Sequence, residues 1–304
     1  IYAFGGDPVS AQRAGFNTVF IQIFVFAFMG CLAGLGGMTR TVLTGSCQPT
    51  TLDGYEMTCI AAAVLGAKPA YNLYRDISFY HGERTEAEKT VKAFAEEQGI
   101  SYGEYPQSLI DLYERNPETK DFVLNYPFRK DTGVDLSVWK GSRTVPLFLQ
   151  WDPMWGYEKY GKGFIAETGC GPTCLAMVGY YLTGDENMNP RQVARFAQEN
   201  GYYSRGSGSS WTLISEGSGG LGLKATEIPL VKKKMVDALE AGKPIICAMR
   251  EGDFTTTGHY IVLRGVKDGE FQVNDPNSVV NSEKLWSYEQ IEGQIRNLWV
   301  MEKA

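Results

Sequence analysis

Histidine and basic charge are both scarce in this sequence. Only His81 and His259 occur among 304 residues, and 29 lysines and arginines stand against 35 aspartates and glutamates, a formal net charge of -6. This charge argues against a nucleic-acid partner, because basic side chains on the phosphates supply most of the affinity in such complexes. A structural zinc site needs four ligands. We therefore predict no metal, and nothing in the sequence calls for a cofactor.

Regular cysteine spacing is also absent. The six cysteines stand at positions 31, 47, 59, 170, 174 and 247, which is not the pattern of a disulfide framework. We therefore interpret them mostly as free thiols. Cys170 and Cys174 share one helical face, but too few further ligands accompany them for a metal, and we disfavour a strained local disulfide.

Residues 19–38 form a long apolar run in which Gln22 is the one strongly polar side chain. A helix of this length can cross a bilayer, so we predict a transmembrane helix here. A buried core helix is the alternative. Arg13 precedes the run and Arg40 follows it, so charge does not set the orientation.

The sequence around this run is specific. It contains the segments Ile1–Gly15, Ser46–Thr50 and Gly54–Gly66. With the apolar run, they resemble the later part of permease subunits of bacterial sugar ABC transporters, and the resemblance ends near Ala67. In that family the residues before the span dock on the ATPase, but transport needs several packed spans, and only one full-length span is predicted here. We therefore interpret residues 1–69 as a permease fragment that anchors an unrelated domain, and expect no ATPase partner.

Residues 70–144 are predicted to be a helical linker. Thr85–Gln98 has a capping threonine, early acidic residues and an apolar stripe, and it ends before a glycine. A second helix is predicted over Pro106–Arg115. An irregular link then leads to a strand over Val145–Leu149, which opens the third domain, 145–304.

Within this third domain, helices come first and strands follow. Apolar periodicity predicts helices over Thr173–Leu182, Pro190–Glu199, Trp211–Ser218 and Val231–Ala241, and β-branched or aromatic runs predict strands over Pro244–Met249, Gly258–Val266, Glu270–Asn274 and Arg296–Met301. A buried helix followed by strands that tight turns join is an α+β arrangement.

Cys170 stands where the buried helix should begin. Pro172 suits a first turn, where its missing N–H costs nothing. The free N–H groups and the positive end of the helix dipole favour a thiolate at Cys170. His259 opens an apolar strand and supplies an imidazole, so together they provide a thiol nucleophile and its base. Cys174 is the rival nucleophile, but it lies a full turn inside the helix and is expected to pack in the core.

Two further side chains can complete such a site. Asp275 ends the predicted strand that follows the one carrying His259, and pairing of the two strands would bring the carboxylate and the imidazole together. The alternative is a turn aspartate that caps its own backbone. Gln150 closes the predicted strand before the nucleophile and is a candidate oxyanion donor. A surface glutamine is its alternative.

Five motifs occur in order over about residues 145–301: Gln150–Gly156, Gly169–Met177, Gly206–Trp211, Gly258–Leu263 and Val273–Ser278. They resemble family thirty-nine of the cysteine peptidases, in its broad "like" branch of bacterial domains. The resemblance implies a papain-like fold, in which a central helix packs on an antiparallel sheet. It also implies these roles: nucleophile Cys170, base His259, orienting acid Asp275 and oxyanion donor Gln150. Founding members cut bacteriocin leaders after a double glycine and place this glutamine only a few residues before the cysteine, whereas here it lies 20 positions before.

We therefore predict that residues 145–304 hydrolyse peptide bonds in a peptide or protein substrate, with Trp211 and Gly258 beside that substrate. The anchor at residues 19–38 would tether the domain to a bacterial membrane, on the outer side. A catalytically silent or acyl-transferring peptide-binding module of the same fold is the alternative.

Overall fold

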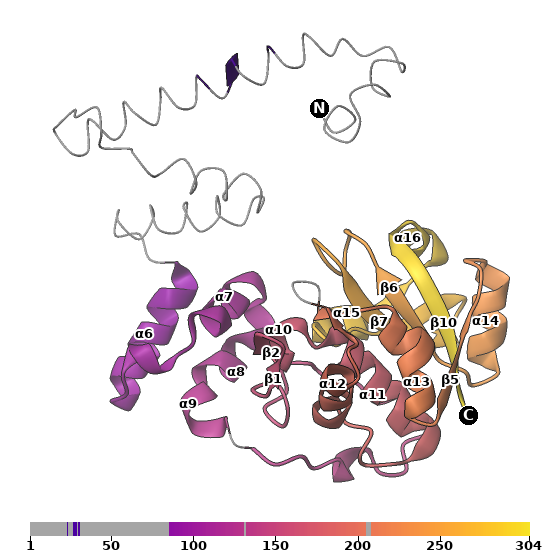
Figure 1. The fold of residues 1–304 in the computed structure, drawn as a ribbon, viewed down its shortest axis with the longest axis horizontal. Coiled ribbons are helices and arrows are strands. Elements are labelled where there is room, and N and C mark those ends of the chain that lie inside the picture. The colour runs from indigo at the N-terminus through magenta and orange to yellow at the C-terminus, as the bar shows by residue number, and fades with distance from the viewer. Residues whose placement is uncertain (1–22, 24–26, 29, 31–84, 131, 205–207) are drawn as a thin grey trace. The chain divides into compact units, whose positions relative to one another are not determined.

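The computed structural model describes residues 23, 27, 28, 30, 85–130, 132–204 and 208–304. Residues 84–304 form one compact unit (Figure 1). Apart from four isolated residues, the membrane helix predicted over 19–38 lies outside the described residues. No helix in the described part of the chain combines the length and the hydrophobicity that a membrane crossing needs.

Two predicted helices open this unit. The first, α6 (Glu86–Gln98), begins at the cap Thr85, whose hydroxyl accepts a hydrogen bond from the Glu88 amide at 3.2 Å. The second is α7 (Gln107–Arg115). The irregular link predicted after it contains a 3-10 turn at Pro117–Thr119 and two short helices, α8 (Lys120–Leu124) and α9 (Tyr126–Arg129). Helices of four or five residues are too short to show an apolar period, which is why the pattern missed them.

The core of α6, α7 and α8 includes side chains from beyond residue 145. Tyr157, Phe164 and Ala166 are buried in the same hydrophobic cluster as the three helices. The ring of Tyr157 stacks on Phe122 with 4.1 Å between the centroids, and its hydroxyl donates to the Phe122 carbonyl at 2.6 Å. The helical region is therefore built into the fold of the residues that follow it. The domain boundary at residues 144 and 145 stays a prediction.

A six-stranded antiparallel sheet forms the other half of the unit, in the order β5-β10-β6-β7-β8-β9. Its strands are β5 (Leu223–Glu227), β6 (Ile245–Met249), β7 (His259–Lys267), β8 (Glu270–Asn274), β9 (Leu285–Trp286) and β10 (Ile295–Lys303). Four of them were predicted, and β5 and β9 were not. The turn between β7 and β8 places Asp268 and Gly269 at φ 55° and 81°, as a two-residue hairpin turn requires.

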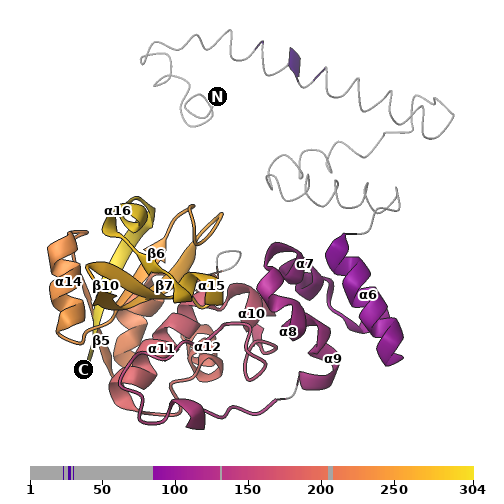
Figure 2. The same ribbon diagram turned by 180° about the vertical axis from the view of Figure 1, so that it is seen from behind.

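Helices cover both faces of this sheet (Figures 1 and 2). Ile246 and Ala248 on β6 share a core with α11 (Cys170–Thr183), whereas Cys247 and Met249 share the opposite core with α14 (Lys232–Glu240). This alternation is the period of a strand buried on both sides. The helix predicted over Pro190–Glu199 is present as α12, with the same bounds. Shorter elements include α10 (Ile165–Thr168), α13 (Ser218–Gly220), α15 (Val279–Glu283), α16 (Tyr288–Ile291), and the strand pairs β1–β2 (Lys159–Tyr160, Gly163–Phe164) and β3–β4 (Tyr203–Ser204, Gly208–Ser209). The predicted α+β class is confirmed.

The strand predicted over Val145–Leu149 is wrong, because these residues have no regular secondary structure and join no sheet. Pro146 has no N–H to offer a neighbouring strand. The side-chain amide of Asn274 donates instead to the carbonyls of Val145 and Pro146, at 3.1 and 2.9 Å. These bonds fix the segment against the end of β8, so it reaches the site without a strand ladder.

Candidate active site

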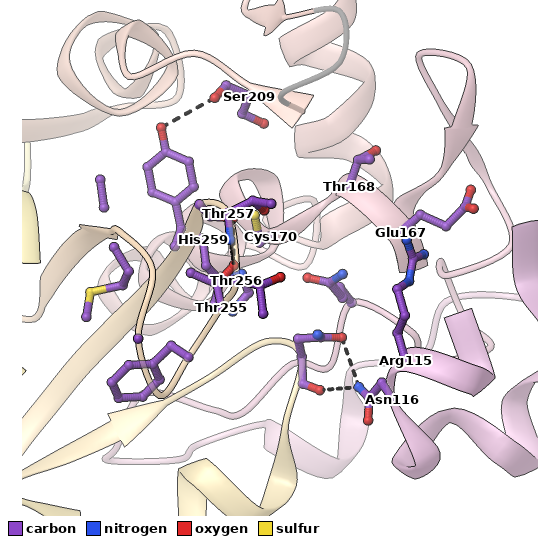
Figure 3. Close-up of a pocket in the computed structure, with 18 of the residues that line it drawn as sticks. Arg115, Asn116, Glu167, Thr168, Cys170, Ser209, Thr255, Thr256, Thr257 and His259 are labelled. Carbon is purple, nitrogen blue, oxygen red and sulfur yellow. Dashed lines mark hydrogen bonds between the residues drawn. The ribbon is translucent and has the colours of Figure 1, made fainter. Parts of the chain in front are cut away.

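One cavity of about 730 Å³ brings together most of the residues that the sequence singled out (Figure 3). Of the predicted site residues, these line it: Gln150, Cys170, Trp211, Gly258 and His259. Asp275 lies behind His259, with only 1 % of its surface exposed. Cys170 and His259 lie beside each other in Figure 3. The cavity is therefore lined by a thiol, an imidazole and a side-chain amide.

Cys170 is the first residue of α11, as predicted, and it is half-buried at the cavity. The cap position before it is Gly169, so no side chain covers the first turn of the helix. A Cβ atom on Gly171 would lie 2.8 Å from the Ser209 side chain, so only glycine fits there. The sulfur thus lies at the N-terminal end of a helix, where the dipole of the helix is positive.

His259 is paired with Asp275 through the imidazole Nε2 and the carboxylate Oδ1, 2.7 Å apart. The pairing follows from the sheet, because β7 begins at His259 and β8, its antiparallel neighbour, ends one residue before Asp275. The thiol of Cys170 is also close enough to raise the pKa of His259. Since Nε2 is taken by the carboxylate, Nδ1 is the nitrogen left for the sulfur.

The charge of His259 depends on a balance of opposing effects. Burial lowers the pKa of His259, but the carboxylate of Asp275, through its charge and its hydrogen bond, and the Cys170 thiol outweigh burial and raise it to about 10. The imidazole is therefore protonated near neutral pH. A protonated imidazole next to a thiol stabilises the thiolate.

Asp275 is held by more than its histidine. Its Oδ1 also accepts from the Asn277 amide at 2.9 Å, and its Oδ2 accepts from the side chain of Asn281 at 2.9 Å. The hydroxyl of Ser282 accepts from the Asp275 amide at 2.9 Å. Asp275 thus combines the two roles that the sequence left open, a turn cap and an imidazole partner. Asn281 was missed, because an asparagine six positions away has no motif to mark it.

Gln150 is buried, at 3 % exposure, and its side-chain nitrogen donates to the carbonyl of Ala166 at 2.7 Å. One of its two amide hydrogens remains for another acceptor. Its Oε1 is buried without a hydrogen-bond partner among the described residues. Gln150 is therefore a fixed polar group on the cavity wall and not a surface side chain.

Of the three cysteines that the structure describes, only Cys170 reaches the cavity. Cys174 and Cys247 are fully buried, and burial raises the pKa of both thiols. Both are therefore neutral core side chains. In the described ranges, no group of three or more histidine, cysteine, aspartate or glutamate side chains is arranged to bind a metal.

Trp211 stands at the edge of the cavity with 41 % of its surface exposed. Its ring meets Trp299 edge-on, with 6.0 Å between the centroids, and the guanidinium of Arg296 lies 5.4 Å from the ring centre. Gly258 follows residues 252–257, which line the same cavity. No Cβ would crowd at Gly258, so its position does not demand a glycine.

The helical region also reaches the cavity, which the sequence did not indicate. Leu112, Arg115 and Asn116, at the end of α7, line it (Figure 3). Asn116 donates to the carbonyl of Asn277 at 2.7 Å. Sequence patterns carry no signal for this contact, because 161 positions separate the two asparagines.

Residues 142–303 match the model of the Peptidase_C39 like family. Residues 1–75 match a model described as branched-chain amino acid transport system / permease component. Within this first segment, the chain is 42% identical to the ribose import permease protein RbsC of Escherichia coli K12 over 66 residues, which are 22% of this chain and 21% of that protein. It is 38% identical to the D-allose permease AlsC of the same organism over 66 residues, 22% and 20% of the two chains. The chain thus spans about a fifth of the length of these curated relatives, and the predicted permease resemblance is confirmed.

Solved structures that resemble the chain are C39-like peptidase domains. The peptidase domain of Streptococcus ComA, a bi-functional ABC transporter, has a TM-score of 0.35 and 21% identity, covering 45% of this chain and 93% of that one. A double glycine motif protease from an AMS/PCAT transporter in complex with the leader peptide has a TM-score of 0.33 and 17% identity, with coverage of 54% and 96%. A C39-like peptidase from Bacillus anthracis has a TM-score of 0.32 and 16% identity, covering 53% of this chain and 96% of that one.

Proposed function

Because the chain belongs to the Peptidase_C39 like family through residues 142–303, we propose that it is a cysteine peptidase with Cys170 as its nucleophile. The observation that carries this proposal is the cavity in which the thiol of Cys170 meets the buried pair of His259 and Asp275. A helix end and a protonated imidazole both favour the thiolate on which such catalysis depends.

The reaction begins when the thiolate attacks the carbonyl carbon of a peptide bond and forms a C–S bond, while the carbonyl electron pair moves to oxygen. As the tetrahedral intermediate collapses, the C–N bond breaks and the leaving amine takes the proton from Nδ1 of His259. Water then gives a proton to this imidazole and attacks the thioester carbon. The C–S bond breaks, and the thiolate and the imidazolium are restored.

The oxyanion requires donors at the place where its charge develops. We assign this role to the amides at the start of α11 and to the second amide hydrogen of Gln150, whose first hydrogen holds the Ala166 carbonyl. Asp275 keeps the imidazole oriented and charged. We place the substrate beside Trp211 and Gly258, because both residues line the cavity.

We also propose that residues 19–38 anchor the enzyme in a bacterial membrane, with the peptidase on the outer side. The permease-like residues 1–75 support the membrane association. Protease treatment of intact cells tests the side: release of the domain from outside is expected, and a domain that becomes sensitive only after lysis contradicts it.

The test of the peptidase uses the full chain, a broad peptide library and mass spectrometry of the products. Cys170→Ala should abolish cleavage, while Cys174→Ala, the matched control in the same helix, should retain it. Cleavage that survives in Cys170→Ala, or is lost only in Cys174→Ala, would reject the assignment. Peptide binding without turnover by the parent protein would favour the alternative, a peptide-binding module.

A further inference from the structure

Residues 116–118, in the helical region, form hydrogen bonds with residues 277–279, which follow Asp275. Glu118 accepts hydrogen bonds from the Ser278 hydroxyl at 2.5 Å and from the Val279 amide at 2.7 Å. Asn116, two residues earlier, donates from its side chain to the Asn277 carbonyl at 2.7 Å. The side chain of Asn116 in turn accepts from the Glu118 amide at 3.1 Å. Both residues lie outside the segment that matches the peptidase family, 142–303.

One chain of hydrogen bonds leads from Glu118 to the catalytic pair. The Ser278 hydroxyl that donates to Glu118 also accepts from the Asn281 amide at 3.1 Å, and so caps α15. The Asn281 side chain then donates to Oδ2 of Asp275 at 2.9 Å. Asp275 Oδ1 holds His259 at 2.7 Å. The carboxylate of Glu118 is therefore linked to the carboxylate of Asp275 through two intermediate residues, Ser278 and Asn281.

A second chain starts at Asn116. It fixes the carbonyl of Asn277, and the amide of the same residue donates to Oδ1 of Asp275 at 2.9 Å. The indole N–H of Trp151 donates to that carbonyl as well, at 3.2 Å. The two chains meet on the two oxygens of a single carboxylate. Bonds that involve an ionised group are stronger than neutral ones, so the Glu118 chain should be the more important.

We propose that Asn116 and Glu118 form a clamp that positions Asp275 against His259, so that the helical region is a working part of the active site. This proposal rests on the proposed peptidase function. Neither residue acts on the substrate in this role. They are positioning residues, because they act through the loop at residues 275–279 and the start of α15.

The clamp has a physical requirement that a substitution can remove. Without Glu118, the first turn of α15 loses a charged cap and the Ser278 hydroxyl loses its acceptor, so the loop gains freedom and Asp275 departs from its best geometry. Small errors of position at a catalytic centre reduce turnover by about tenfold to hundredfold. Glutamine can keep both contacts, with its oxygen on the Val279 amide and its nitrogen on the hydroxyl.

The experiment compares Glu118→Ala, Glu118→Gln and Asn116→Ala in the full chain. The first readout is a titration of His259 by NMR in a His81→Gln background, which leaves one histidine signal. Glu118→Ala should lower the pKa of His259 and reduce kcat about tenfold, with little change in KM. Asn116→Ala should do the same more weakly, and Glu118→Gln should stay close to the parent. Glu114→Ala, an exposed carboxylate on α7, is the matched control and should match the parent.

Two outcomes would overturn the clamp. The first is a folded Glu118→Ala protein, as judged by circular dichroism, with an unchanged His259 titration. The second is an equal effect of Glu118→Gln and Glu118→Ala, which would show a through-space charge effect and no positioning. A parent protein that cleaves no peptide would contradict the peptidase function, but the NMR titration would still decide on the clamp.

Discussion

The helical region at residues 85–129 and the peptidase region from residue 142 onward differ in how openly their sequences display their roles. The peptidase region holds cysteine, histidine and aspartate in recognisable motifs. The helical region holds no such motif, yet it shares a core with Tyr157 and Phe164 and lines the cavity with Arg115 and Asn116. The reacting residues can be recognised in the sequence by their residue types, whereas the residues that position them can be recognised only from contacts in the folded structure.

The largest expected effect concerns the peptidase region alone. Asp275→Ala should reduce kcat about a thousandfold or more, because the imidazole loses both its charge partner and its orientation. Steady-state kinetics with a cleaved peptide measure the loss. Asp121→Asn, an exposed carboxylate of the helical region on α8, is the control. Comparable losses of kcat in the two variants would contradict a special role for Asp275.

The second prediction tests whether the two regions fold as one. Phe122 is 3 % exposed and stacks on Tyr157 across the boundary between them. Phe122→Ala should lower the free energy of unfolding by about 3 to 5 kcal/mol. All six tryptophans lie beyond residue 138, so their fluorescence reports on that part of the chain, whereas far-UV circular dichroism also reports on the helices before it. If the two regions fold as one, the urea transitions measured by the two signals should coincide and shift together. Two separated transitions would show that the helices unfold independently.

The third prediction concerns the pH dependence of the pair that His259 and Asp275 form within the peptidase region. The pKa of His259 is raised to about 10 in the folded state, above its ordinary 6.5. The pair therefore contributes its full stability below pH 6.5 and loses it as the pH rises toward 10. Asp275→Asn should cost roughly 2 kcal/mol or more at pH 6, and the gap to the parent should narrow by pH 10. Urea unfolding at both values measures it, and a gap that widens with pH would contradict the charge assigned to His259.

The smallest expected effect lies at the edge of the cavity. Trp211→Ala should raise KM about fivefold with little change in kcat, because the exposed ring offers contact area to the substrate and supplies no group for the bond-making steps. Trp211→Phe keeps an aromatic face and should recover most of the loss. An unchanged KM in the alanine variant would make Trp211 a packing residue for Trp299.

Much of the fold could be predicted from periodicity and caps. The helix that begins at Cys170 and the hairpin that aligns His259 with Asp275 follow from local signals: Pro172 near a helix start, and Asp268-Gly269 in a tight turn. The short helix α8 and the strand β9 were missed because few residues carry their pattern. The strand β5 was missed because, of its five residues, only Leu223 is buried. The segment at Val145–Leu149 was wrongly predicted to be a strand, since the side chain of Asn274, and not a neighbouring strand, binds the carbonyls of Val145 and Pro146.

In the candidate site, too, some residues could be predicted from the sequence and others could not. Cys170, His259 and Gln150 line one cavity, and Asp275 is hydrogen-bonded to His259 behind its wall. Their supports, Asn281 and Glu118, have ordinary side chains at positions that only the folded loop brings near. No spacing rule connects residue 118 to residue 278, because the contact depends on how two separate regions pack.

The most direct test of the proposed thiolate–imidazolium pair of Cys170 and His259 is the rate at which iodoacetamide alkylates Cys170 at pH 6.5. Mass spectrometry of the modified peptide measures this rate. The parent protein and His259→Ala are compared in the full chain, with Cys174 and Cys247 as internal references. The account predicts fast modification of Cys170 in the parent, and a rate about a hundredfold lower without the imidazole. Equal rates in the two proteins would contradict it.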